Sequence, residues 1–99
     1  MLLARTTSAS YERCGELPDL SKYRLVLLAM ENAVGSPFGT SMLPADRFLS
    51  CVDSASAMQY FAQGTRTFYA AYAYVVSDGG LYLKAIGSTG DSAVLYGIP

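Results

Sequence analysis

The sequence predicts an α+β fold, in which a long helix packs on an antiparallel sheet. Residues 41–64 place apolar side chains at helical spacing. Residues 67–87 contain two apolar runs, rich in Tyr and Val, on either side of Ser-Asp-Gly-Gly, which is typical of a hairpin. With 99 residues, 52% of them hydrophobic, the chain is expected to form a single domain over residues 1–99.

Residues 5–14 are polar, with Thr and Ser at the start, and predict a short helix that ends before Gly15 and Pro18. Residues 23–34 allow two interpretations. Half of them share one face of a helical wheel, yet the apolar run 25–30 also fits a buried strand, and periodicity cannot separate the two. If this segment is a strand, Glu31-Asn32 would turn it into a hairpin.

The expected long helix begins near Ser41, which can cap it, and Pro44 is tolerated in its first turn. Gly64 would end it. One apolar face would contain Phe48, Cys51, Val52, Ala55, Met58 and Ala62.

Residues 68–86 are expected to form the hairpin, with Asp78-Gly79 as a two-residue turn. Val76 would then pair with Leu81, Tyr74 with Leu83, and Tyr72 with Ala85, and these six would face the core. A three-residue turn would shift the pairing by one residue. The opposite face would contain Ala71, Ala73, Val75, Tyr82, Lys84 and Ile86, and residues 92–98 would add a third strand to this meander.

The charges are few and dispersed. The net charge is −1, and the seven Lys and Arg form no basic run, which argues against nucleic acid and against an anionic membrane surface as partners. No apolar run approaches the roughly 20 residues of a membrane span, so no membrane insertion is expected. Cys14 and Cys51 are expected to be reduced thiols without metal, in a cytoplasmic protein.

No catalytic constellation is recognisable. The chain has no histidine, which removes Ser-His-Asp and Cys-His arrangements and the commonest metal ligand. Asp46 and Asp53 would lie on a solvated helix face, and the glycine loops lack the GxxxxGK[ST] spacing of a phosphate loop. The expectation is a protein that is not an enzyme and needs no cofactor or metal. Its eight tyrosines are expected in the core or at an interface.

Two stretches carry a resemblance to a known family: "ELPDL" before "LVLLA", and the closing "VVSDGGLYLKAIGSTGDSAVLYG". With these stretches, the order of the segments resembles the roadblock family, which includes roadblock-type dynein light chains, small Ragulator subunits and bacterial partners of Ras-like GTPases. The resemblance covers most of the chain from Glu16 onward and implies the order α-β-β-α-β-β-β, with a strand at residues 23–30. Without it, two helices followed by a three-stranded meander remain the alternative.

The resemblance also implies that residues 68–76 form an edge strand, which pairs with a second subunit beside the helix at residues 43–63. The alternative is a strand that is central in a monomer. A homodimer, or a heterodimer with a similar domain, would explain why this strand is apolar on both faces. The residues expected to bind protein are Phe68, Tyr69, Ala71, Ala73, Val75, Tyr82 and Ile86.

The resulting functional expectation is a non-enzymatic interaction module that scaffolds or regulates a larger partner, for example within a small GTPase system. One alternative is a small inhibitor of the phage-encoded, anti-CRISPR-like type, which occludes a partner's site. Another is a small-ligand-binding subunit, with a pocket lined by Tyr60, Tyr72 and Tyr74.

Overall fold

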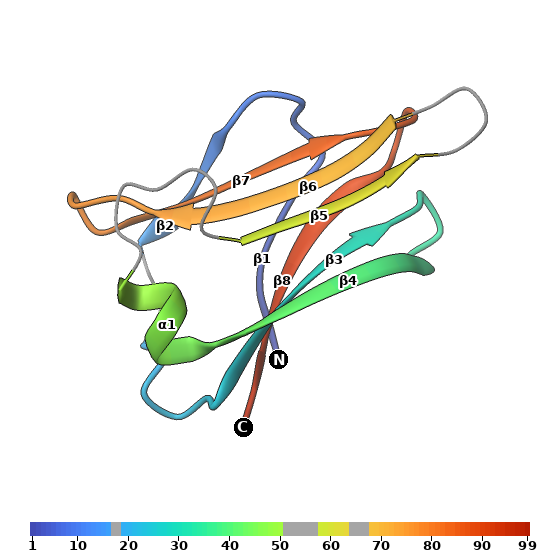
Figure 1. The fold of residues 1–99 in the computed structure, drawn as a ribbon. Coiled ribbons are helices and arrows are strands. Elements are labelled where there is room, and N and C mark those ends of the chain that lie inside the picture. The colour runs from blue at the N-terminus through green and yellow to red at the C-terminus, as the bar shows by residue number, and fades with distance from the viewer. Residues whose placement is uncertain (17–18, 51–57, 64–67) are drawn as a thin grey trace.

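The computed structural model describes residues 1–16, 19–50, 58–63 and 68–99, which form two four-stranded antiparallel sheets packed face to face (Figure 1). The first sheet contains, in spatial order, β1 (Leu2–Thr6), β8 (Ser92–Ile98), β3 (Leu25–Glu31) and β4 (Pro37–Pro44). The second contains β2 (Glu12–Glu16), β7 (Gly80–Ile86), β6 (Phe68–Val75) and β5 (Met58–Gln63). The described residues contain one helix, α1 (Ala45–Ser50).

The predicted α+β fold is therefore wrong, as is the alternative of two helices and a meander. The short helix expected at residues 5–14 is replaced by parts of β1 and β2. In β1, Ala4 and Thr6 are buried while Leu2 and Arg5 are exposed, which is the pattern of a strand with one face against a core. The roadblock-type order of helices and strands is absent from the described residues.

The long helix expected at residues 41–64 is also wrong. Only Ala45–Ser50 are helical, because β4 continues through Ser41 to Pro44 and pairs with β3 from Leu25 to Glu31. The prolines at the two ends of β4 are compatible with an edge strand, where a missing N–H breaks no ladder. Met58 and Ala62, expected on the helix, lie in β5. Residues 51–57 and the expected cap at Gly64 lie outside the described residues.

The strand interpretation of residues 23–30 is confirmed, since β3 spans Leu25–Glu31 and returns through a hairpin to β4. The turn falls later than Glu31-Asn32, at residues 32–36. There the Asn32 Oδ1 atom accepts hydrogen bonds from the backbone N–H groups of Val34 and Ser36. An asparagine that accepts from its own turn in this way stabilises the hairpin locally.

The β6–β7 hairpin is confirmed, but its predicted register is wrong by one residue. Val75 pairs with Leu81, and Ala73 pairs with Leu83. The turn has three residues: the Val76 N–H donates to the Gly80 carbonyl, and Gly79 has a φ of 86°. A three-residue loop that ends in a left-handed glycine is one of the common hairpin connections.

The register shift exchanges the two faces of β6. Ala71, Ala73 and Val75 point into the core, whereas Tyr72 and Tyr74, expected in the core, point outward. On β7 the predicted inward residues Leu81, Leu83 and Ala85 are buried as expected.

The last strand has the predicted bounds, 92–98, but does not close a meander. β8 crosses to the other sheet and pairs with β1 and β3. β6 pairs with β5 on one side and β7 on the other, so the expected edge position of residues 68–76 is wrong and the central position is what the structure shows. Because both of its edges are already paired, β6 cannot also pair with a strand of a second subunit.

Side chains of both sheets meet in one apolar core. Phe48 of α1 joins the core at one end of the sandwich. Alanines on β6 share this core with leucines on β3 and β7, and small side chains opposite large ones fill a core efficiently. The fully buried larger side chains include Val26, Leu28, Met30, Phe48, Leu81, Leu83 and Leu95. In the described part of the chain, no helix has the length and apolar character needed to cross a bilayer.

Candidate functional site

The outward face of the second sheet gathers aromatic side chains from three segments. We call it the tyrosine face. Its members are half-buried: Tyr11 ahead of β2, Tyr72 and Tyr74 on β6, and Tyr82 and Lys84 on β7. Because β6 and β7 are direct neighbours, Tyr72 lies opposite Lys84 and Tyr74 opposite Tyr82.

The rings of this face contact one another in favourable geometries. Tyr11 meets Tyr74 edge to face, with ring centroids 4.8 Å apart and an interplanar angle of 81°. Tyr74 and Tyr82 are stacked at 5.4 Å. Aromatic pairs at such separations each contribute about 0.5–1.5 kcal/mol beyond their buried area. The rings are therefore held in place before any partner arrives.

Lys84 places a positive charge within this aromatic surface. Its Nζ atom lies 4.4 Å from the ring centroid of Tyr11 and 4.3 Å from that of Tyr72. Cation–π contacts of this kind orient the ammonium without neutralising it. Among the described residues, no carboxylate lies within ion-pair distance of Lys84. Its charge therefore stays available to an anionic group.

Arg13 lies at the margin of the tyrosine face, paired in register with Tyr82. It forms an exposed ion pair with Glu16 at 3.4 Å. Exposed pairs of this kind are worth little, so Arg13 can exchange Glu16 for another anion at small cost.

The Tyr11 hydroxyl remains neutral at physiological pH. Burial, followed by the neighbouring Tyr74 and Tyr72, raises the pKa of Tyr11 above its usual value. A neutral phenol both donates and accepts hydrogen bonds, so the face offers polar tips on apolar rings.

The residues predicted to bind protein are separated by the fold. Ala71, Ala73 and Val75 are buried between the sheets and cannot contact a partner. Tyr82 belongs to the tyrosine face, and Ile86 follows it by alternation on the same side of β7. Tyr69 is half-buried on β6. Phe68 begins β6, but its side chain is not among those that the structure describes.

Tyr11, Tyr72, Tyr74 and Lys84 were not among the residues predicted to bind protein. The alternation in "YAAYAYV" was a usable signal, because tyrosine with its polar tip suits a half-wet face and alanine suits a tight core. The expected ligand pocket lined by Tyr60, Tyr72 and Tyr74 is not formed by Tyr72 and Tyr74, because both face outward from the second sheet. The Tyr60 side chain is not among those that the structure describes.

The described residues contain no group of three or more potential metal ligands among His, Cys, Asp and Glu. Cys14 is a free, half-buried thiol, and burial, with a smaller effect of Glu12, raises its pKa. Cys51 lies outside the described residues. A raised pKa lowers the thiolate fraction, so Cys14 is a poor nucleophile.

Comparison with protein-family models, with curated proteins and with solved structures finds no match for this chain. The roadblock resemblance gains no support from these comparisons.

Proposed function

We propose that this protein is a non-enzymatic binding module that recognises a protein partner through the tyrosine face. The observation that carries the proposal is the gathering of Tyr11, Tyr72, Tyr74 and Tyr82 around Lys84 on one open sheet face. Tyrosine is enriched in protein interfaces and their energetic hot spots, because it offers a large, rigid and amphipathic contact at low entropic cost.

The charge of the face indicates the kind of partner. Lys84 is not ion-paired within the described residues, and Arg13 is held only by an exposed pair with Glu16. A second copy of this chain is a poor occupant, because packing the face on itself would add a second Lys84 charge and no carboxylate opposite either one. We therefore propose a different protein, which presents an acidic residue to Lys84. Scaffolding, regulation or inhibition of that partner would each proceed through this contact.

The test compares two variants in capture from the native host followed by quantitative mass spectrometry. Tyr74→Ser removes a central ring of the tyrosine face. Met42→Ser is the matched control, because Met42 is an exposed apolar residue on the first sheet. We expect a protein that binds the wild type and Met42→Ser, and that binds Tyr74→Ser at least tenfold less, since a hot-spot truncation costs about 2 kcal/mol or more.

The charge is tested with Lys84→Glu, which should also abolish capture of the same protein. Captured material whose recovery is equal for wild type, Tyr74→Ser and Lys84→Glu would refute the proposal. So would capture that depends on Tyr74 but is removed by nuclease treatment, because the ligand would then be a nucleic acid.

A further inference from the structure

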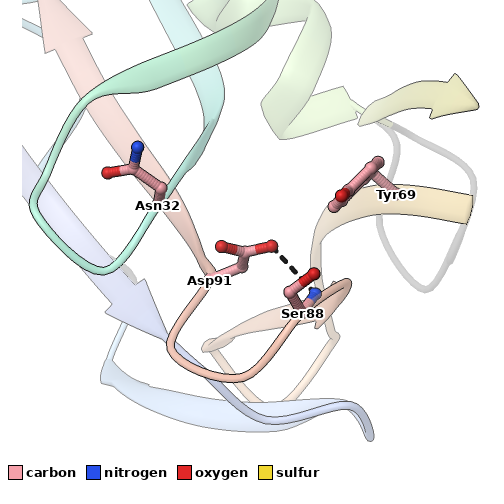
Figure 2. Close-up of a pocket in the computed structure, with 4 residues that line it drawn as sticks. All are labelled: Asn32, Tyr69, Ser88 and Asp91. Carbon is pink, nitrogen blue, oxygen red and sulfur yellow. Dashed lines mark hydrogen bonds between the residues drawn. The ribbon is translucent and has the colours of Figure 1, made fainter. Parts of the chain in front are cut away.

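The β3–β4 turn and the β7–β8 loop both lie at the end of the sandwich remote from α1 (Figure 1). Residues of both line a hollow of about 280 Å³. The described residues that line it are Asn32, Tyr69, Ser88 and Asp91 (Figure 2). None of them belongs to the tyrosine face. Its size is at the lower limit of ligand pockets and suits a single small group.

The β7–β8 loop holds the Asp91 carboxylate in a defined place. The Ser88 N–H donates to Asp91 Oδ2 at 2.9 Å, and the Asp91 N–H donates back to the Ser88 carbonyl at 3.0 Å. Gly87 permits this approach, since a Cβ there would lie 2.8 Å from Asp91 Oδ2 and 3.0 Å from the Tyr69 ring. The carboxylate, the Ser88 side chain and the Tyr69 ring thus lie around one space, as Figure 2 shows.

The charge of Asp91 is not balanced by the described residues. Asp91 is 9% exposed, and within the described part of the chain no Lys or Arg forms an ion pair with it. The neighbouring Glu31 is paired with Arg5 at 3.1 Å, so Arg5 is already engaged. Carboxylates buried to this degree are ordinarily paired with a cation, because losing water costs the charged form several kcal/mol.

We propose that this hollow binds a primary ammonium group, from a small amine or from a lysine side chain. The ammonium would donate a charge-assisted hydrogen bond to Asp91 and a second hydrogen bond to the Ser88 hydroxyl. Its charge would also be attracted by the face of the Tyr69 ring. An ammonium is a compact point charge whose three donors lie on one nitrogen, so a single group can serve Asp91 and Ser88 together.

The test titrates the ¹⁵N-labelled full chain with n-butylammonium chloride, with 1-butanol as the neutral probe of the same shape. We expect saturable shifts of backbone amide signals at Asn32 and residues 87–91 with the ammonium, and none with the alcohol. Asp91→Asn removes the charge but keeps an oxygen for the Ser88 N–H. It should weaken binding about tenfold or more, as expected for loss of a hydrogen bond to a charged group.

The matched control is Asp78→Asn. Asp78 also accepts a backbone hydrogen bond in a loop, from the Gly80 N–H at 2.8 Å, and lies at the other end of β7. The Asp78→Asn substitution makes the same change in net charge as Asp91→Asn and should leave the affinity for n-butylammonium unchanged. N-acetyl-lysine methylamide distinguishes the source: tighter binding than n-butylammonium indicates a lysine side chain, and equal or weaker binding indicates a free amine.

Equal shifts with 1-butanol, or equal loss of affinity in Asp91→Asn and Asp78→Asn, would overturn the proposal. If Asp91→Asn does not fold, the amide shifts of the wild-type protein on titration with n-butylammonium test the proposal by themselves. Shifts that are absent, or that fall outside Asn32 and residues 87–91, refute the site.

Discussion

At the residue scale, Glu31 shows how this protein compensates a buried charge. The Glu31 side chain is 6% exposed, and its Oε1 atom accepts a hydrogen bond from Arg5 at 3.1 Å. Its other oxygen, Oε2, accepts a hydrogen bond from the hydroxyl of Tyr96. That hydrogen bond, with burial as the second cause, raises the pKa of Tyr96 above its usual value. Glu31 and Asp91 are therefore buried alike but compensated differently.

This raised pKa predicts a loss of stability in alkali. A tyrosine whose folded pKa exceeds its unfolded pKa stabilises the fold fully below the unfolded value, about 10, and this contribution is lost as pH rises through the folded pKa. The free energy of unfolding, measured by urea denaturation, should therefore fall above about pH 10. Tyr96→Phe should be less stable by roughly 1–3 kcal/mol at pH 7, because Glu31 loses a hydrogen-bond donor.

The alkaline fall should also be smaller in Tyr96→Phe than in the wild type, since the titrating group is gone. Tyr82→Phe, on the other sheet, is the matched control and should retain the wild-type difference between pH 7 and pH 11. An alkaline fall that is equal in wild type and Tyr96→Phe would assign the loss of stability to other groups.

At the scale of the elements, the register of the β6–β7 hairpin decides which residues are available for binding. Ala73 is fully buried between the sheets, and the adjacent Tyr74 faces outward. Ala73→Lys should therefore prevent folding, because an unpaired buried charge costs several kcal/mol. Tyr74→Lys should remain folded and lose about 1–2 kcal/mol with its ring contacts. Circular dichroism and thermal melting would measure both.

The two-residue turn makes the opposite prediction, since it places Tyr74 in the core and Ala73 outside. A folded Ala73→Lys together with an unfolded Tyr74→Lys would contradict the pairing of Ala73 with Leu83.

The sequence predicted some elements well and others not at all. β8 and the strand at β3 were predictable, because each is a short apolar run bounded by turn residues. The register of β6 was not, because Asp78-Gly79 fits both a two-residue and a three-residue turn. Residues 41–64 were wrongly predicted as one helix, because the spacing of apolar residues cannot show that Ser41 and Pro44 pair with a neighbouring strand.

The candidate sites were less predictable than the strands. Tyr11 reaches Tyr72 and Tyr74 only because β2 pairs with β7, a contact between segments far apart in the chain. The hollow likewise joins Asn32, Tyr69 and Asp91 from three separate elements. Local patterns contain no information on such pairings, which depend on the topology of the whole sheet.

At the scale of the whole molecule, the chain passes repeatedly from one sheet to the other. β1 and β2 belong to different sheets, as do β2 and β3, β4 and β5, and β7 and β8. Each sheet is thus assembled from separated segments, and the two share one core. The apolar face of each sheet is covered only when the other sheet packs on it, so we expect the two sheets to fold together.

This arrangement predicts a single cooperative unfolding transition. Leu28 on β3 and Leu83 on β7 are both fully buried but belong to different sheets. Leu28→Ala and Leu83→Ala should each destabilise the protein by roughly 2–5 kcal/mol. In each variant, far-ultraviolet circular dichroism and tyrosine fluorescence should report the same midpoint in urea, as a two-state domain requires. If Leu28→Ala shifted the circular dichroism transition but left the fluorescence transition in place, the sheets would be independent folding units, because most described tyrosines lie on the second sheet.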